Sequence, residues 1–474
     1  MSTLKTFFKD TIIYGLATVL PRLMNFVLVP LHTHILATKS YSDNTTFYVY
    51  AAFFNVLLTY GIETAFFRFF NKSEEKNKVF STAFIALLVT SSLFLLFVLF
   101  FNNDLASLVH LKPLHFNLLV SILVLDTIVV IPFAYLRASK KPIKFAFIKF
   151  SNILIYVLLN LFFLWAIPKY NISYPNYNKN ELVSYIFISN LAASVVTLLL
   201  LLPYFFKVKL QFSLTIFKQL LNYGLPIMVA GIAYVINENF DKWLLPEILG
   251  KDINGAYSGC YKIAVFMTIF IQAFRLGAEP FFFNHAKATN AKQTYAIIMK
   301  YFVIFGSAML LFILAYLDIF KALIVRDQSY WIAINIVPIV LLANLFLGIY
   351  FNLAIWYKLT DKTSYGMYLS IIGAVVTIIF NLIMIKHMGF IASAWATLLA
   401  YGIMTVISYA LGQKHYPVPY NLKSILSYLT LAIILSIIAL QTQGNYYINT
   451  TLVLVFLTLT FFLEKKTIKQ LLKK

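Results

Sequence analysis

Residues 79–101 read VFSTAFIALLVTSSLFLLFVLFF, a run of 23 positions without a charged side chain. Folded as an α-helix, this run would be about 34 Å long, and the hydrocarbon core of a bilayer is about 30 Å thick. In a soluble protein such a helix would need apolar cover on every side. The run therefore predicts a transmembrane helix.

Similar apolar runs of about 20 residues recur along the whole chain of 474 residues. Hydrophobic residues make up 61% of the sequence and charged residues 12%, which is far from the balance of soluble domains. The composition excludes a soluble enzyme, a nucleic-acid-binding protein and a disordered scaffold. We predict an all-α polytopic membrane protein with about 14 spans: 11–31, 47–67, 79–101, 116–136, 147–167, 182–202, 222–245, 256–280, 295–317, 331–355, 365–385, 389–411, 425–440 and 448–463.

The basic residues predict the orientation of these spans. If loops alternate sides, 26 of the 38 lysines and arginines fall on the side of the N-terminus, eight on the other side and four within spans. Positive charge concentrates in cytoplasmic loops, so we expect both termini in the cytoplasm. The net charge of +21 is spread over these loops, which argues against a nucleic-acid partner.

No catalytic signature interrupts the spans. The sequence contains no phosphate-binding loop, no dinucleotide-binding glycine motif and no HExxH helix, and its loops are too short for a soluble domain. His32 and His34 are the one close histidine pair, and no carboxylate or cysteine is nearby. Cys260 is the single cysteine, so no intramolecular disulfide can form. We predict a protein that is not an enzyme and has no cofactor or metal.

Three pairs of segments indicate an internal repeat. They occur in the same order and with slowly growing offsets of 209, 216 and 221 residues: FKDTIIYGL (8–16) with FKQLLNYGL (217–225), GIETAFFRFFN (61–71) with GAEPFFFN (277–284), and RASKK (137–141) with KLTDK (358–362). Six spans separate the copies, so both have the same orientation in the membrane. This predicts a parallel repeat of two six-helix lobes, 1–210 and 211–415, around a central cavity. Residues 416–474 would add two helices and a basic tail.

Charged residues within the spans are the candidate functional residues, because each costs at least about 2.5–3.5 kcal/mol on insertion scales. Arg22 lies about 16 Å into the first span, near the midplane. It either pairs with an acid such as Glu63 or Asp126, or contacts an anion in a wet cavity. Asp126 in the fourth span is either a coupling site for H⁺ or Na⁺, or a partner in helix packing.

Two further groups follow helical spacing. In the seventh span, Glu238 with Lys242 and Asn237 with Asp241 are four residues apart and predict a polar face, either a structural lock or a cavity wall. The second group lies near the cytoplasmic ends of the second and eighth spans.

Arg275 and Glu279 have the same spacing in the eighth span, and Glu63 is the repeat equivalent of Glu279. These glutamates would help to close an inner gate. We expect Glu279 to pair with Arg275, and Glu63 to pair with a base across the lobe interface.

Two stretches carry a family resemblance. YGIETAFFRF (60–69) and DKWLLPEILGKDINGAYSGCYKIA (241–264) resemble motifs of the bacterial polysaccharide flippases, transporters of O-antigen type in the multidrug/oligosaccharidyl-lipid/polysaccharide exporter superfamily. The resemblance covers essentially the whole chain. One departure is Tyr41-Ser42, where the family usually has Tyr-Gly.

The resemblance implies outward flipping of an undecaprenyl-pyrophosphate-linked oligosaccharide by alternating access, for surface polysaccharide synthesis. Arg22 would match the basic cavity residues that receive the pyrophosphate, with Arg275 second. Membrane lipids and the polysaccharide polymerase machinery are the expected partners. Because no ATPase motif is present, the energy would come from an H⁺ or Na⁺ gradient or from the membrane potential alone. Moving two negative charges outward is downhill by roughly 4–5 kcal/mol per 100 mV.

Two alternatives remain open at this level. A multidrug or cation exporter of the same superfamily would have a net acidic cavity, and the spans hold five acids and four bases. A membrane polymerase or ligase of the same sugar pathway would need a large outer loop. The longest outer loop here covers only about residues 168–181.

Overall fold

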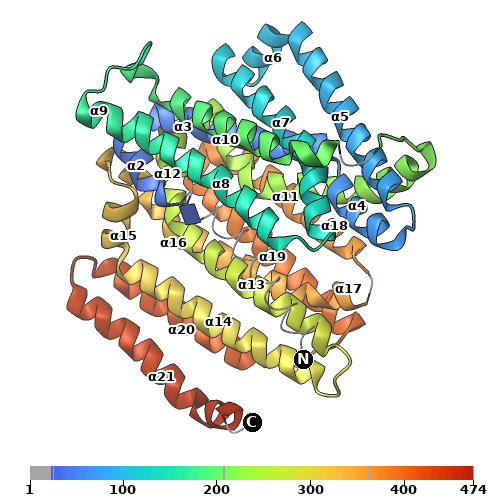
Figure 1. The fold of residues 1–474 in the computed structure, drawn as a ribbon. Helices are drawn as coiled ribbons and strands as arrows, with labels where there is room; N and C mark the ends of the chain where they lie inside the picture. The colour runs from blue at the N-terminus through green and yellow to red at the C-terminus, as the bar shows by residue number, and fades with distance from the viewer. Residues whose placement is uncertain (1–22, 25, 207–208, 361, 473–474) are drawn as a thin grey trace. The chain divides into compact units, whose positions relative to one another are not determined.

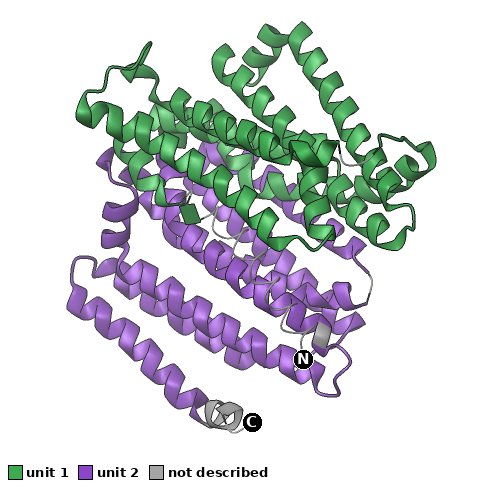
Figure 2. Ribbon diagram, in the orientation of Figure 1, with its two compact units in different colours: residues 1–255 green, residues 256–474 purple. Residues whose placement is uncertain are grey.

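The computed structural model describes residues 23–24, 26–206, 209–360 and 362–472, and every regular element among them is helical (Figure 1). The chain divides into two compact units, 1–255 and 256–474, which Figure 2 colours separately. The predicted lobe boundaries at residues 210 and 415 stay a prediction.

The first unit contains nearly all of the helices that the N-terminal half of the sequence predicts. Its elements are α2 (Val29–Ile35), α3 (Thr38–Thr59), α4 (Ile62–Lys72), α5 (Lys76–Phe100), α6 (Asn102–Leu108), α7 (Pro113–Ala138), α8 (Pro142–Leu161), η1 (Phe162–Ala166), α9 (Ile167–Tyr170), η2 (Lys179–Glu181), α10 (Leu182–Phe205) and α11 (Leu214–Ile248). The helix α12 (Lys251–Tyr261) begins in this unit and ends in the second.

The second unit continues from α12 to the C-terminus. Its elements are η3 (Lys262–Ala264), α13 (Val265–His285), α14 (Ala291–Ala315), α15 (Leu317–Ile324), η4 (Gln328–Ile336), α16 (Val337–Leu353), α17 (Ile355–Leu359), α18 (Ser364–Met388), α19 (Ile391–His415), α20 (Leu422–Gln441) and α21 (Tyr446–Leu472). The last helix, drawn in red in Figure 1, packs with α20 against α14.

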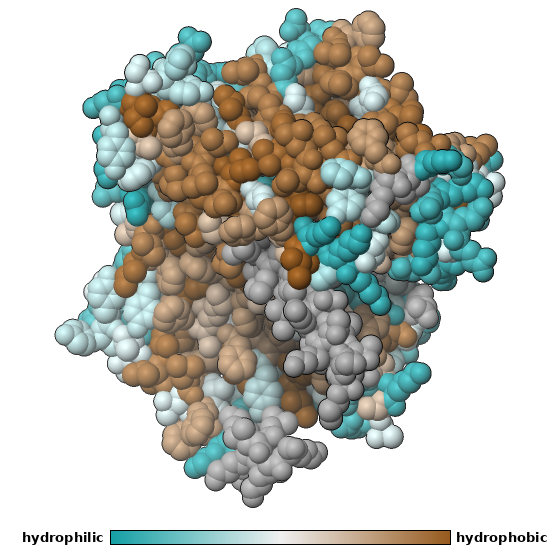
Figure 3. All heavy atoms as spheres, in the orientation of Figure 1, coloured by the Kyte–Doolittle hydropathy of each residue, from teal (hydrophilic) through white to brown (hydrophobic). Residues whose placement is uncertain are grey.

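Thirteen helical stretches among the described residues are long and apolar enough to cross a membrane. They coincide with the second to fourteenth predicted spans, so the prediction of these spans is confirmed. The first predicted span falls mostly outside the described residues. Large apolar side chains on the surface are correspondingly common: Phe100 is 82% exposed and Val406 66% exposed. Figure 3 shows broad apolar areas on the visible face, as expected of helices that contact lipid.

One helix break differs from the prediction. The second span was expected to be continuous over 47–67, but the structure divides it at Tyr60 and Gly61, both with positive φ. A Cβ atom on Gly61 would lie 2.3 Å from the carbonyl oxygen of Gly224 in α11. Because neither glycine has a side chain, the two backbones can approach closely here. The helix of the second span is interrupted at this point, between the end of α3 and the start of α4.

Candidate functional site

In the second unit, Glu279 on α13 binds two basic side chains. Its Oε1 accepts hydrogen bonds from Arg275 Nε at 3.2 Å and Nη2 at 3.1 Å, and from Lys358 Nζ at 2.8 Å. The Arg275 guanidinium carbon also lies 4.0 Å from the ring centroid of Phe351. The predicted pairing of Glu279 with Arg275 is present, and Lys358 is an additional partner. We refer to Arg275, Glu279 and Lys358 as the triad.

Local structure explains how these side chains meet. Arg275 and Glu279 are one helical turn apart on α13, so their side chains lie on the same face. Lys358 belongs to the short helix α17, and its neighbours Trp356 and Tyr357 are 2% and 7% exposed. Because those two rings are held in the core, the orientation of α17 is determined and Lys358 is directed to Glu279.

The triad has a surplus of positive charge and of donors. It contains two cations and one carboxylate, and Arg275 uses only two of its five N–H donors on that carboxylate. Each side chain is between 25% and 33% exposed, so none of the three is sealed from water. A group of this kind can accept an anion in exchange for, or beside, its own carboxylate.

The first unit contains a related pair. Arg137 Nη1 at the end of α7 donates to Glu63 Oε1 on α4 at 3.1 Å, and the side chains are 45% and 44% exposed. The Arg137 guanidinium carbon also lies 4.7 Å from the centroid of the Phe67 ring. Glu63 therefore has a basic partner within its own unit, and the expected pairing across the lobe interface stays a prediction. Arg137 belongs to the same unit, and its end of α7 packs against α4.

The two carboxylate–base pairs follow the sequence repeat. Glu63 and Glu279 are 216 residues apart and Arg137 and Lys358 are 221 apart, within the offsets of the repeated segments. In each copy, a glutamate in the second span of that copy binds a basic residue at the end of the fourth span of that copy. Arg137 and Lys358 fall just after the predicted spans 116–136 and 331–355, where a loop is expected. Their places in RASKK and KLTDK were the signal that could have identified them.

Asp126 lies in the middle of α7. Its Oδ1 accepts a hydrogen bond from Ser194 Oγ on α10 at 2.8 Å. Lys149 on the neighbouring helix α8 is half-buried, and its Nζ lies 4.3 Å from the ring centroid of Phe133 on α7. The helix-packing hydrogen bond that was one expectation for Asp126 is present, and the coupling role stays a prediction.

Three of the four residues on the predicted polar face of α11 are buried, and Glu238 is half-buried. Asn237, Asp241 and Lys242 are 4%, 3% and 8% exposed. Lys242 Nζ lies 3.1 Å from Asp241 Oδ1 and donates to the backbone carbonyl of Glu238 at 2.8 Å. These contacts are of the kind expected for a structural lock, and the role of this face as a lock or as a cavity wall stays a prediction.

Arg22, the first candidate for the pyrophosphate contact, lies outside the described residues. His32 is buried, and its Nε2 lies 3.0 Å from Asn160 Oδ1. No group of three or more histidine, cysteine or acidic residues that could hold a metal occurs in the part of the chain that the structure describes.

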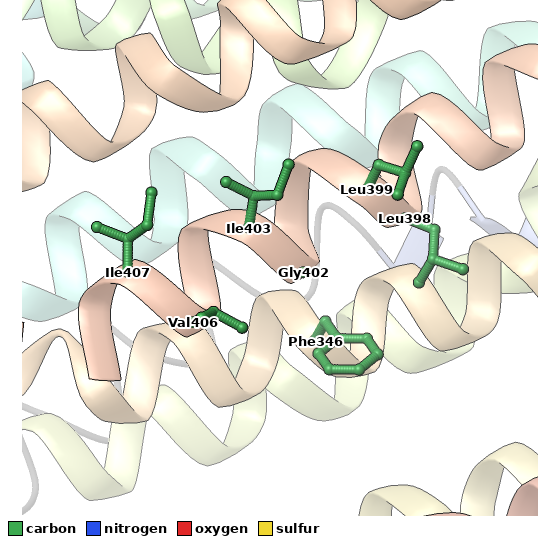
Figure 4. A pocket seen from close by; sticks show the side chains of 7 residues that line it. All are labelled: Phe346, Leu398, Leu399, Gly402, Ile403, Val406 and Ile407. Carbon is green, nitrogen blue, oxygen red and sulfur yellow. The ribbon is translucent and has the colours of Figure 1, made fainter. Parts of the chain in front are cut away.

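An apolar groove of about 380 Å³ lies between α16 and α19 (Figure 4). Its lining contains only apolar side chains and one glycine: Phe346, Leu398, Leu399, Gly402, Ile403, Val406 and Ile407. Without a charged or hydrogen-bonding side chain, this groove suits a hydrocarbon chain and cannot hold a charged head group.

More than half of the chain matches a known protein family. Residues 7–278 match the model of a family described as polysaccharide biosynthesis protein. No curated protein matches the chain.

Several solved transporter structures share the fold. The structure titled lipid II flippase MurJ, in an inward closed conformation, is 17% identical, with a TM-score of 0.73 over 96% of this chain and 100% of that one. An inward-facing multidrug resistance MATE transporter is 13% identical, with a TM-score of 0.66 over 83% of this chain and 94% of that one. The MATE multidrug transporter DinF-BH is 16% identical, with a TM-score of 0.61 over 87% of this chain and 96% of that one. At these identities the likeness concerns the fold alone.

Proposed function

The chain belongs to the family of polysaccharide biosynthesis proteins, and from this premise we propose that it flips an undecaprenyl-pyrophosphate-linked oligosaccharide from the cytoplasmic to the outer leaflet of a bacterial inner membrane. The protein is a multi-pass membrane protein with a transporter fold. It would act by alternating access, with both termini in the cytoplasm, and it would not be an enzyme.

The observation that carries the proposal is the surplus of positive charge at the triad. A pyrophosphate cannot cross hydrocarbon without compensating charges, and the N–H groups of Arg275 that do not bind Glu279 suit its oxygens. Lys358 brings a second cation to the same place. Glu279 would be the resident counter-ion, which the substrate displaces when it binds.

The lipid part of such a substrate needs no polar site. A polyprenyl chain can stay in the bilayer while the head group passes through the protein. The likeness to a lipid II flippase supports a fold able to handle a lipid substrate. The energy would come from the membrane potential or from H⁺ or Na⁺ coupling at Asp126, which lies midway along α7.

A cation exporter is the second candidate, because MATE transporters share the fold. The two functions predict opposite binding at the triad. Two cations around one carboxylate attract an anion and repel an organic cation.

Binding to the purified protein tests the proposal. We expect an undecaprenyl pyrophosphate to bind and an organic cation such as tetraphenylphosphonium to bind at least tenfold more weakly. Lys358→Ala should weaken pyrophosphate binding about tenfold, because it removes a charge-assisted hydrogen bond. Lys362→Ala is the matched control, since the Nζ of Lys362 lies 3.2 Å from His415 Nδ1 and outside the triad. Preferential binding of the organic cation would reject the flippase.

A further inference from the structure

The first two turns of α3 and the first turn of α12 are joined by three polar contacts. Thr38 Oγ1 donates to Asp252 Oδ1 at 2.7 Å, and Lys251 Nζ donates to Asp43 Oδ1 at 2.7 Å. A third bond runs from Asn254 Nδ2 to Ser42 Oγ, also at 2.7 Å. We refer to these six side chains as the interlock.

The interlock is closely packed at its centre. Ser42 and Asn254 are both 0% exposed, so their hydrogen bond is shielded from water. A Cβ atom on Gly255 would lie 1.9 Å from the carbonyl oxygen of Thr38, so only glycine allows this approach. The ion pair at the rim is more open, with the side chain of Lys251 38% exposed and that of Asp43 17% exposed.

The two segments of the interlock are copies of each other in the repeat. An offset of 212 residues, between the offsets of 209 and 216 found on either side, aligns TKSYSDNTTFYVYAA (38–52) with GKDINGAYSGCYKIA (250–264). Ser42 then corresponds to Asn254, and these two residues contact each other. In a two-fold arrangement, equivalent residues meet only near the axis that relates the copies. The ion pair between Lys251 and Asp43 is not repeated at the equivalent positions, because the residue that corresponds to Asp43 in the second copy is Gly255.

The place of the interlock along the spans suggests its role. The second span carries Asp43 near its start on α3 and Glu63 twenty residues later on α4, toward its other end. The eighth span likewise begins with Lys251 and reaches Glu279 near its other end. Each of these two spans therefore has the interlock at the predicted outer end and a carboxylate–base pair at the predicted inner end.

We infer that the interlock is the outer closure of the transporter, which holds the external ends of the second and eighth spans together and must separate before cargo reaches the outer leaflet. The inference rests on the proposed transport function and on the predicted orientation, but not on the identity of the cargo. Breaking the interlock exposes a buried hydrogen bond and separates an ion pair, so the closed arrangement is favoured until other interactions compensate.

Accessibility of a cysteine tests this role without any substrate. Asn55 is an exposed polar residue near the middle of the membrane span Thr38–Lys72, and Asn55→Cys serves as the reporter for an impermeant thiol reagent added outside. The native Cys260 is fully buried, so the parent protein sets the background. We expect Asp43→Asn and Lys251→Met each to raise external labelling about fivefold.

A charge exchange and a matched control make the test specific. The double variant Asp43→Lys, Lys251→Asp restores an ion pair of reversed polarity and should return labelling close to that of the parent. Lys112→Met breaks the Lys112–Glu181 ion pair outside the interlock and should leave labelling unchanged. Equal labelling of the reporter in the parent, both single variants and the double variant would overturn the inference.

A cross-link provides an independent measurement. The variant Ser42→Cys, Asn254→Cys, with Cys260→Ser, should form a disulfide when an oxidant such as copper phenanthroline is added, and this disulfide should stop transport. A reducing agent should restore transport. A fully cross-linked protein that still transports would also overturn the inference. If the labelling results hold but no lipid-linked oligosaccharide is bound or moved, the closure stands and only the proposed substrate fails.

Discussion

Lys358 Nζ lies 2.8 Å from Glu279 Oε1, although the two residues are 79 positions apart in the chain. The pair repeats, in the second unit, the contact of Arg137 with Glu63 in the first. In both copies, an ion pair thus connects the second span of the copy to the end of its fourth span. Because these side chains are a quarter to nearly half exposed, each pair is individually weak and can open and close. That property suits a gate.

Neutralising the gate carboxylates should favour inward-open states. With the Asn55→Cys reporter in inverted vesicles, we expect Glu63→Gln and Glu279→Gln each to raise labelling from the cytoplasmic side two- to fivefold, because a pair worth up to about 1 kcal/mol is lost. Glu74→Gln, at an exposed glutamate in the loop before α5, is the matched control. Unchanged labelling in both gate variants would contradict the gate.

The predicted orientation can be tested in intact cells. Asn176 lies in the exposed loop between α9 and η2, which should face outward, and Thr289 lies between α13 and α14, which should face inward. Asn176→Cys should react with an impermeant reagent in whole cells, whereas Thr289→Cys should react only after lysis. The reverse pattern would place the termini outside.

Arg22 tests the anion contact predicted from sequence alone. Arg22→Ala should abolish flipping in a folded, inserted protein, and Arg22→Lys should retain at most partial activity because it loses the bidentate fork. Thermal stability and glycan export should be measured on the same samples. A joint loss of stability and export would indicate a structural ion pair, and a stable variant with normal export would remove Arg22 from the mechanism.

Glu464 should contribute to stability through the C-terminal helix. It is 5% exposed and binds Lys300 Nζ at 2.5 Å and the Tyr428 hydroxyl at 2.8 Å, which ties α21 to α14 and α20. Glu464→Gln leaves a half-buried ammonium without its counter-ion, so we expect the unfolding free energy to fall by about 3 kcal/mol.

The control for Glu464 is Glu75→Gln. This substitution removes an exposed pair with Lys78 and should cost less than about 0.5 kcal/mol. Thermal unfolding in detergent measures both variants. Equal melting temperatures for the two would show that the buried pair does not hold α21.

Properties that depend on neighbouring residues could be predicted from the sequence. The thirteen described spans follow from apolar runs that have no favourable place in water, because twenty such residues need a hydrocarbon surrounding wherever they lie. The pairing of Arg275 with Glu279 follows from helix geometry, since residues four apart share a face whatever surrounds them. The repeat likewise indicated that Glu63 and Glu279 occupy equivalent positions.

Contacts between distant segments were decided only by the tertiary structure. No local rule selects Lys358 as the second partner of Glu279, or Arg137 as the partner of Glu63, because each contact depends on how two helices are rotated and displaced relative to each other. The break at Gly61 exists because the backbone of Gly224 approaches it, and the bond between Ser42 and Asn254 exists because two helix starts meet. Apolar lipid-facing runs specify that a helix crosses the membrane, whereas its rotation and its neighbours depend on side-chain packing summed over the whole bundle.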